Sequence, residues 1–462
     1  MRIWSSRRSP MLLAARYVLP VSAPFVEHGA VLVRDGVIVE VGARDDLVAR
    51  YPEEEVRDFG QAALMPGFVD LHTHLEYAVF RGMVDDAPYS QWKLQVMRKE
   101  AALEPEDWAV SAELGATEAV RSGITTIADI TDSGASVGAA SAAGLRGVIY
   151  REVSTMDRAR VEQALDEALG DVARWKDAAS ARIEIGVAPH SPYSCHPKLF
   201  EAVAHAAVEE DLPVAMHLAG SKDEHDFVKY GSSLLGQDYR DASGWSSIGW
   251  LPTGVSPVRY VYQWGILEVP RMLAVHCVHL DEGDVDILAK TRTAVAYCPR
   301  CNLKLGMGIA PLRELVDAGV VVGIGTDSPA SNSTMDFFDE MRIGLLVQRG
   351  LAGEARFYPA ERFVRMATLD GARALGIDHL VGSLEPGKRA DVVAVDLSRS
   401  HQVPTRDPYG AVVHTTNQDD VLLTMIDGEV VFDRGSVDAA SFADLVERAD
   451  RVQAKLRDGG SA

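Results

Sequence analysis

Residues 66–77 read PGFVDLHTHLEY, an apolar run that ends on two histidines with one residue between them. Side chains alternate along a strand, so His72 and His74 share one face and form a chelating pair if the run is a strand. Comparable short apolar runs recur along the chain, and several of them also end on a histidine or an aspartate. These runs are TTIADI (125–130), GVIYREV (147–153), IEIGVAPHS (183–191), PVAMHLAG (213–220), MLAVHCVHL (272–280), TAVAYCP (293–299) and VVVGIGTDS (320–328).

Longer stretches of helical character separate the apolar runs. We expect helices at 106–121, 158–177, 197–210, 282–290, 311–318, 334–348 and 360–375. Strand–helix alternation repeated about eight times predicts a parallel (β/α)8 barrel. A doubly wound sheet is the alternative, but no GxGxxG phosphate loop follows an early strand.

Both ends of the chain are rich in β-formers instead. AVLVRDGVIVEVG places Gly36 between two apolar strands, and further strands are expected at 390–397 and 421–435. Because these segments flank the barrel, we expect them to pair into one small β-sandwich. The predicted organisation is the N-terminal part of the sandwich (1–65), a distorted (β/α)8 TIM barrel (66–385) and the C-terminal part of the sandwich with a terminal helix (386–462).

Composition narrows the kind of partner. The chain has 462 residues with 46 basic and 67 acidic side chains, a formal charge of −21. Such a chain disfavours binding to nucleic acid or an anionic membrane surface and favours a small-molecule substrate. No apolar run reaches the ~18–20 residues of a membrane-spanning helix, and we read residues before Met11 as a short extension. The four cysteines form no disulfide scaffold, and we expect a cytoplasmic protein with free thiols.

Six polar residues at the ends of the apolar runs are the candidate site. In a (β/α)8 barrel the carboxyl ends of the strands ring one mouth, where active sites lie. A single histidine near a strand end is more often structural, but six such residues together favour a metal centre. Imidazole suits Zn²⁺ and Fe²⁺, a bound metal lowers the pKa of water toward ~7, and Asp327 would accept the proton of that water. The six residues are His72, His74, His190, His217, His276 and Asp327.

The motifs PGFVDLHTHLEY, MHLAG, HCVHL and GTDSPASN together resemble those of the amidohydrolase superfamily. The resemblance covers nearly the whole chain and is carried by a specific set of motifs. It implies one divalent metal, Zn²⁺ first and Fe²⁺ as the alternative, held by His72, His74, His217 and Asp327. It further implies that His276 hydrogen-bonds the bound water or the tetrahedral intermediate. Members of this superfamily often dimerise, so a homodimer is left open.

Further motifs narrow the resemblance to a subgroup. HTHLEYAVFRG, SQWKLQV, APHSPYS and CPRCNLKLGMGIAP are similar to deaminases of S-adenosylhomocysteine, methylthioadenosine and aminodeoxyfutalosine, with triazine chlorohydrolases as close relatives. The implied activity is metal-dependent hydrolytic deamination of a 6-aminopurine nucleoside. Trp92 and His190 would contact the substrate, Asn302 would hold a polar edge of it, and Arg151 would meet a ribose or carboxylate. A packed aromatic, a turn residue and a solvated charge are the alternative interpretations of Trp92, Asn302 and Arg151.

One position departs from the deaminase pattern. The third histidine ligand of such deaminases is followed by x-x-Glu, whereas this chain has Gly220 there. Loss of that acid would remove a factor of ~10²–10⁴ from catalysis. Three explanations stay open: an inactivating substitution, another acid (Asp223, Glu224 or Glu76), or a leaving group such as chloride that departs unprotonated. A protein that keeps the metal pocket but does not turn over is a further alternative.

Overall fold

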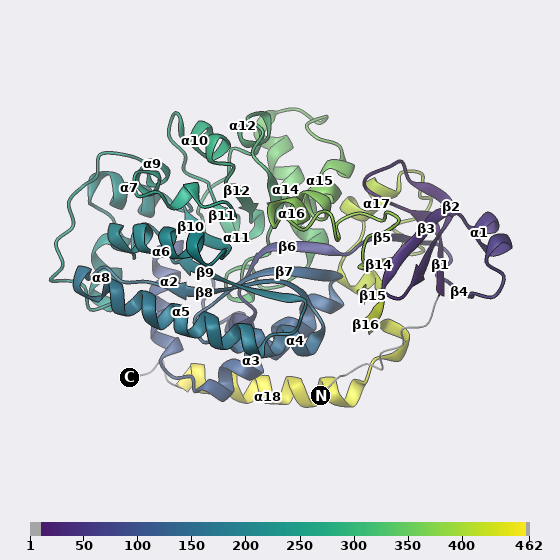
Figure 1. Cartoon of the computed structure of the whole chain (residues 1–462), viewed down its shortest axis with the longest axis horizontal. Coiled ribbons are helices and arrows are strands. Elements are labelled where there is room, and N and C mark those ends of the chain that lie inside the picture. Colours follow the sequence, from purple (N-terminus) through teal and green to yellow (C-terminus); the bar gives the residue numbers. More distant parts are fainter. Residues whose placement is uncertain (1–10, 459–462) are drawn as a thin grey trace.

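A barrel of eight parallel strands forms the larger part of the computed structural model, which describes residues 11–458 (Figure 1). Spatial order follows chain order from β6 to β13, and helices lie outside, so the (β/α)8 prediction is confirmed. The expectation for residues 1–10 lies outside the described residues. The barrel strands are β6 (Phe68–Thr73), β7 (Ile124–Thr131), β8 (Arg146–Val153), β9 (Ile183–Pro189), β10 (Val214–Leu218), β11 (Met272–His276), β12 (Ala294–Tyr297) and β13 (Val322–Ile324).

The first and last barrel strands meet at their carboxyl ends. The backbone N–H of Asp327 donates to the carbonyl oxygen of His72 at 2.7 Å. The buried Asp70 carboxylate accepts from the Thr326 backbone N–H at 2.9 Å and from the Thr326 hydroxyl at 2.6 Å. These contacts hold the two ends of the barrel sheet together at the mouth where the candidate ligands lie.

Helices and short turns connect the strands. The α-helices are α1 (Arg44–Arg50), α2 (Tyr89–Glu100), α3 (Pro105–Arg121), α4 (Ala135–Ala143), α5 (Val161–Ala178), α6 (Pro197–Glu209), α7 (Lys222–Tyr230), α8 (Arg240–Ala242), α9 (Pro257–Tyr262), α10 (Asp284–Thr291), α11 (Pro299–Lys304), α12 (Leu312–Asp317), α13 (Pro329–Asn332), α14 (Phe337–Ala352), α15 (Ala360–Met366), α16 (Leu369–Ala374), α17 (Pro408–His414) and α18 (Ala439–Asp458). The 3₁₀ helices are η1 (Leu75–Phe80), η2 (Arg158–Arg160), η4 (Ile266–Glu268), η5 (Gln418–Asp420) and η6 (Arg434–Ser436). Element η3 (Leu235–Tyr239) is a short π-helix.

The helix expected at 360–375 is instead two helices, α15 and α16. Thr368 lies between them with φ −133° and ψ −88°, far from helical values. The carbonyl oxygen of the preceding Ala367 accepts from the backbone N–H of Val69 on β6 at 2.9 Å. A contact with a strand of the barrel therefore accompanies the break, and nothing local in the sequence announces it.

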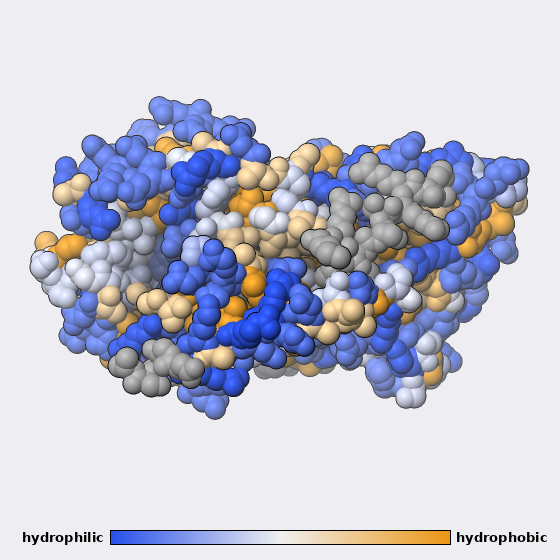
Figure 2. Space-filling model, turned by 90° about the horizontal axis from the view of Figure 1, so that it is seen from below, coloured by the Kyte–Doolittle hydropathy of each residue, from blue (hydrophilic) through white to orange (hydrophobic). Residues whose placement is uncertain are grey.

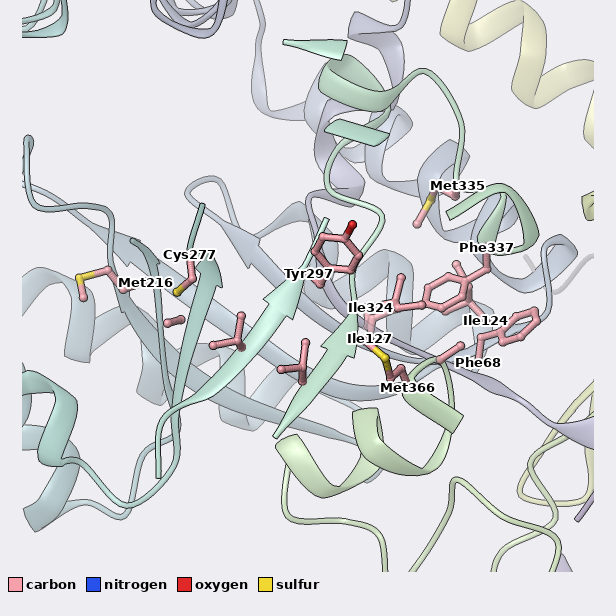
Figure 3. Close-up of a cluster of buried hydrophobic side chains, with 14 of the residues drawn as sticks. Phe68, Ile124, Ile127, Met216, Cys277, Tyr297, Ile324, Met335, Phe337 and Met366 are labelled. Atoms are coloured by element: carbon pink, nitrogen blue, oxygen red, sulfur yellow. The ribbon is translucent and has the colours of Figure 1, made fainter. Parts of the chain in front are cut away.

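The core between the strands and the outer helices is closely packed (Figure 3). Phe68 of β6 stacks on Phe337 of α14 with ring centroids 4.9 Å apart, and Ile124 and Ile127 of β7 belong to the same cluster. All four side chains are fully buried. Burial of large apolar side chains drives folding and makes the barrel a rigid frame for the residues at its mouth.

Strands from both chain ends pair into a second sheet, as the sequence predicts (Figure 1). β5 pairs antiparallel with β14, which places Ala63 opposite Val395. Asp35 and Gly36 both have positive φ between β2 and β3, as a type I′ hairpin turn requires. The strands of this sheet are β1 (Met11–Val18), β2 (Val26–Arg34), β3 (Val37–Ala43), β4 (Glu55–Asp58), β5 (Ala62–Pro66), β14 (Val392–Asp396), β15 (Val421–Ile426) and β16 (Glu429–Asp433).

The face of the molecule seen in Figure 2 is largely hydrophilic. Hydrophilic side chains cover most of the face in Figure 2, with apolar ones scattered among them. Helix α18 runs from the chain-end sheet along the barrel beside α3 (Figure 1). Within residues 11–458, no helix combines the length and the apolar character needed to cross a membrane.

Candidate metal centre

Four histidines and one aspartate converge at the carboxyl end of the barrel. His72 and His74 come from the end of β6, His217 from β10, His276 from β11, and Asp327 follows β13. The Nε2 atom of His72 lies 3.5 Å from Asp327 Oδ1, and that of His74 lies 3.9 Å from the same oxygen. His217 Nε2 lies 3.4 Å from His74 Nε2, and His276 Nε2 lies 4.0 Å from Asp327 Oδ2. Strands far apart in the sequence thus deliver these donors to one point.

Backbone carbonyl groups orient two of the histidine rings. The Nδ1 atom of His74 lies 2.8 Å from the carbonyl oxygen of Ile130, and that of His217 lies 3.0 Å from the carbonyl oxygen of His190. Because a carbonyl can only accept, Nδ1 carries the proton in both rings. Their Nε2 lone pairs therefore face each other across 3.4 Å. Such contacts to the second nitrogen are the usual way in which proteins orient metal-binding histidines.

A divalent cation fits this donor set. Two facing lone pairs repel each other unless a proton or a cation lies between them. Burial, and to a smaller extent repulsion from His72, lowers the pKa of His74 to about 3. Protonation of His74 is therefore unfavourable, which leaves a cation as the group between the two nitrogens. Both ring nitrogens of the buried His72 lack a hydrogen-bond partner among the described residues. Donors about 2 Å from one shared ion lie roughly 3–3.5 Å apart, close to the spacings observed.

The pKa values of His276 and Asp327 also suit metal binding. Burial lowers the pKa of His276 to about 4, against the opposing charge of Asp327. Burial also opposes ionisation of Asp327, but the close approach of His72, at 3.5 Å, and the nearby His276 and His74 hold its pKa well below the usual range. The lowered pKa values of His74 and His276 favour neutral imidazoles beside an ionised carboxylate, which is the form in which these groups bind metals.

The backbone is strained around the centre. Ala219, His276 and Asp327 all have left-handed φ angles, of 52°, 78° and 59°. Residues other than glycine rarely adopt this conformation, and such strain clusters at functional sites. The strain bends the chain where β10, β11 and β13 end, and it turns His276 and Asp327 toward the shared point.

A cavity opens beside the donor set. Trp92 and His190, two of the expected substrate contacts, both line it. The Trp92 indole N–H has no hydrogen-bond partner in the described part of the chain, and the Nδ1 atom of His190 lies 2.7 Å from the Ser194 hydroxyl. The lining residues are His74, Glu76, Tyr77, Tyr89, Trp92, Lys93, Val96, Ile130, Asp132, Glu152, His190, His217, His276, Leu305, Asp327, Ser328 and Ser331.

Two of the expected substrate contacts lie elsewhere. Asn302 lies behind His276, with its Oδ1 atom 3.0 Å from His276 Nδ1, so it positions that ring and does not line the cavity. Arg151 forms ion pairs with Asp171, at 2.7 Å, and with Asp132. Since side chains alternate along β8, the neighbouring residue, not Arg151, faces the cavity. Contact with substrate stays a prediction for these two side chains.

Gly220, where the deaminase pattern has an acid, is enclosed. A Cβ atom added there would lie 3.0 Å from His276 Cδ2 and 3.0 Å from the terminal methyl of Met307. The position thus adjoins His276, as an acid serving this centre should. The Met307 methyl crowds the first carbon of any side chain placed there.

The other acids considered for this role are already engaged. Glu224 accepts from the backbone N–H groups of Ala219 at 2.7 Å and Gly220 at 2.9 Å and does not line the cavity. Asp223 accepts from the Ser90 hydroxyl and does not line the cavity either. Glu76 lines the cavity, but it lies in η1, where strand alternation no longer applies. Its carboxyl group accepts from Thr131, Ser133 and the backbone of Asp132.

Two polar residues of the cavity were missed by sequence reasoning. Glu152 of β8 and Lys93 of α2 both line it, and neither forms a hydrogen bond or ion pair through its side chain among the described residues. Burial raises the pKa of Glu152 to about 8, while Lys93 opposes that rise. The available signal was an acid at the end of the run GVIYREV, in the same place as the histidines of other runs.

The fold and the centre define a class. A (β/α)8 barrel with histidines and an aspartate converging at the carboxyl ends of its strands is the architecture of a metal-dependent hydrolase. The chain belongs to the amidohydrolase family, whose sequence pattern matches residues 63–431. A shorter match, at residues 29–53, is to the imidazolonepropionase-like composite domain of bacteria.

Curated relatives and solved structures agree with this assignment. The 5-methylthioadenosine/S-adenosylhomocysteine deaminase of Moorella thermoacetica is 33% identical to this chain, over an alignment that covers 91% of this chain and 93% of the relative's length. The 5′-deoxyadenosine deaminase of Methanothermobacter thermautotrophicus is 32% identical over 93% of this chain and 95% of its own. The crystal structure of a zinc-bound adenosine deaminase from Xanthomonas campestris superimposes with a TM-score of 0.84 and 29% sequence identity. The superposition covers 97% of this chain and 98% of the other chain. Atrazine chlorohydrolase of Arthrobacter aurescens, 22% identical with a TM-score of 0.80, shares the fold over 96% of this chain and its full length.

Proposed function

We propose that this chain is a zinc-dependent aminohydrolase that replaces the 6-amino group of an adenine nucleoside with oxygen and releases ammonia. The observation that carries the proposal is the pair of facing Nε2 atoms of His74 and His217, 3.4 Å apart beside Asp327. This arrangement calls for a cation. The names of the curated relatives supply the substrate class, an adenine nucleoside.

The residues of the centre have separable roles. His72, His74, His217 and Asp327 would hold the ion, which when bound supplies positive charge and makes water acidic enough to react near neutral pH. Asp327 accepts the proton of the attacking water, since its ionised form is favoured. His276, oriented by Asn302, lies 4.0 Å from Asp327, and once the proton that Asp327 takes from water passes to His276 Nε2, this nitrogen donates a hydrogen bond to the oxygen that becomes attached to the ring carbon. Trp92 and His190 border the space for the purine.

A direct experiment measures ammonia release by zinc-loaded protein. The panel contains adenosine, 5′-deoxyadenosine, methylthioadenosine, S-adenosylhomocysteine and aminodeoxyfutalosine. The expected result is turnover of at least one nucleoside that disappears in His72→Ala. Absence of ammonia from every nucleoside, in the native chain and in Gly220→Glu alike, would overturn the proposal.

A second candidate is removal of a leaving group that departs without a proton, such as chloride on a heteroaromatic ring. The observation that favours it is Gly220, which supplies no acid and whose Cβ position is crowded by the Met307 methyl. Chloride release from a chlorotriazine without ammonia release from any nucleoside would select this candidate. Nucleoside binding without either release would indicate a protein that binds but does not turn over.

A further inference from the structure

We propose that Glu340 of α14 is a positioning residue that holds Asp327 and His276 of the metal centre at the separation the reaction needs. Glu340 does not line the cavity, so it acts through the two chain segments that carry Asp327 and Asn302. The inference rests on the proposed function, because it assigns the support of the same centre.

Glu340 is a carboxyl group enclosed by nitrogen donors. It is 0% exposed, its Oε2 atom accepts from the backbone N–H of Arg300 at 3.2 Å, and its Oε1 atom accepts from the side-chain amide of Asn332. The Arg300 guanidinium also lies 3.8 Å from Oε1 as an ion pair. A buried carboxylate is costly unless such partners hold it. Both partners follow strands of the barrel, since α11 comes after β12 and α13 comes after β13.

The first of the two segments carries Asp327. The Asn332 side-chain amide that donates to Glu340 also donates to the carbonyl oxygen of Thr326, at 2.5 Å. The N–H group of the same peptide, which belongs to Asp327, donates to the carbonyl oxygen of His72 at 2.7 Å. Both polar atoms of this peptide are therefore held. The peptide plane is fixed directly before Asp327, whose left-handed φ of 59° turns its carboxylate toward the histidines.

The amide group of Asn332 serves only as a donor. Its Nδ2 atom faces two acceptors, Thr326 and Glu340, which fixes the orientation of the amide. Its Oδ1 atom is buried and has no hydrogen-bond partner within residues 11–458. An unsatisfied buried oxygen costs stability, so stability alone is a poor explanation for an asparagine at this position.

The second segment carries Asn302. Arg300, whose backbone N–H is bound by Glu340, lies two residues before Asn302 in α11. The Oδ1 atom of Asn302 lies 3.0 Å from Nδ1 of His276 and orients that ring. The Arg300 guanidinium donates to the carbonyl oxygen of Asn332 at 3.3 Å, which ties α11 to α13. Glu340 therefore lies where the supports of Asp327 and His276 meet.

The separation at stake is the one between Asp327 and His276. The Oδ2 atom of Asp327 lies 4.0 Å from Nε2 of His276, farther than a hydrogen bond reaches. In the proposed reaction a proton passes between these atoms, so both groups must be held close to this separation. A displacement of ~1 Å at reacting groups costs ~100-fold in rate. Release of either segment would cause such a displacement and leave Trp92 and His190 in the cavity wall.

The first test variant is Glu340→Gln. It keeps the volume but replaces one accepting oxygen with an N–H donor, which meets a nitrogen donor in either orientation of the amide. We expect kcat for ammonia release from the preferred nucleoside to fall by about 10- to 100-fold while KM changes less than about threefold. The dissociation constant of zinc, measured by competition with a chromophoric chelator, should rise by about 10-fold because Asp327 is displaced.

Asn332→Ala interrupts the same connection one step nearer to Asp327. It should lower kcat and zinc affinity in the same way, and it keeps the Glu340 carboxyl group. The loss in the double variant should be smaller than the product of the two single losses, because the residues act on a shared partner. If Glu340→Gln does not fold, Asn332→Ala carries the test by itself.

Asp391→Asn is the matched control for a loss of stability. Asp391 is another buried acid, and it pairs with Arg146 at 3.0 Å where β8 begins, at the opposite end of the barrel from the metal centre. We expect this variant to melt at a lower temperature but to keep the native kcat and zinc affinity.

The outcomes separate the positioning role from the deaminase proposal. The role of Glu340 is overturned by unchanged kcat and zinc affinity in Glu340→Gln, by a loss in KM alone, by single losses that multiply in the double variant, or by an equal loss of kcat in Asp391→Asn. Each of these results leaves the deaminase proposal standing. Absence of ammonia release from the native chain overturns the proposed function instead. The zinc dissociation constants then decide on Glu340, because a rise supports its role and an unchanged value overturns it.

Discussion

Restoring an acid at position 220 is the sharpest perturbation that the structure offers. In Gly220→Glu, the new Cβ would lie 3.0 Å from His276 Cδ2 and from the Met307 terminal methyl, so these groups must move by a few tenths of an ångström. Met307 is flexible, and Gly220 does not have a left-handed φ, so a side chain is conformationally acceptable there. Overpacking usually costs about 1–3 kcal/mol, and we expect the low end of that range.

The expected gain in catalysis is larger than the cost in stability. A positioned general acid contributes ~10²–10⁴ in rate, which lowers the barrier by about 3–5 kcal/mol. We therefore expect kcat/KM for ammonia release from the preferred nucleoside to rise by that factor in Gly220→Glu. The assay is steady-state ammonia release by zinc-loaded protein, with zinc content and thermal melting recorded for each variant.

Gly220→Gln is the matched control for this experiment. Glutamine adds nearly the same volume and meets the same His276 and Met307 atoms, but it cannot transfer a proton. We expect no gain in kcat/KM for this variant. A role for an acid at position 220 is refuted if kcat/KM rises as much in Gly220→Gln as in Gly220→Glu, or if it does not rise in a folded, zinc-bound Gly220→Glu protein.

Three further predictions concern the metal centre and stability. Zinc at 100 times its Kd should raise the free energy of unfolding of the native chain by about 3 kcal/mol, which thermal melts can detect. His72→Ala should abolish this stabilisation by zinc. Unchanged stabilisation of His72→Ala would contradict the assignment of His72 as a metal ligand. Burial raises the pKa of the Glu224 carboxyl group from 4.5 to about 7. The contribution of this group to the free energy of unfolding is therefore full below pH 4.5, and ~3 kcal/mol of it is lost as the pH rises to 7. Urea unfolding across this range should show a shallower pH dependence in Glu224→Gln, and an identical slope would exclude that carboxyl as a source. Arg146 pairs at 3.0 Å with Asp391, which is only 1% exposed, so Arg146→Met should cost about 3–5 kcal/mol in urea unfolding; a loss below 1 kcal/mol would contradict the pair's importance.

Short-range patterns reveal the barrel and the donors of the centre. Apolar runs alternating with helical stretches predict the parallel fold, and the period of two along a strand makes His72 and His74 a pair. His217, His276 and Asp327 could be assigned to the same place because parallel strands end at one mouth. These inferences need only the direction of each strand and the position of a residue within it.

Contacts between elements decide the surroundings of the centre. Asn302 follows β12, yet its side chain lies against Nδ1 of His276 of β11, a contact that the sequence does not reveal. Arg151 is held away from the cavity by Asp171 of α5, and Glu224 is held by the backbone of Ala219 and Gly220. No local pattern specifies these pairings, because each depends on how separate helices and loops pack on the barrel.

The sequence by itself therefore determined the fold class, the likeness to the amidohydrolases and the candidate ligands, because these depend on periodicities and on residues at strand ends. Only the tertiary structure decided which side chains of the mouth are free. It showed Gly220 enclosed by His276 and Met307, and it placed Glu152 and Lys93 in the wall of the cavity. The physical reason is that a side chain's availability is set by the groups packed around it, and those come from strands and helices distant in the sequence.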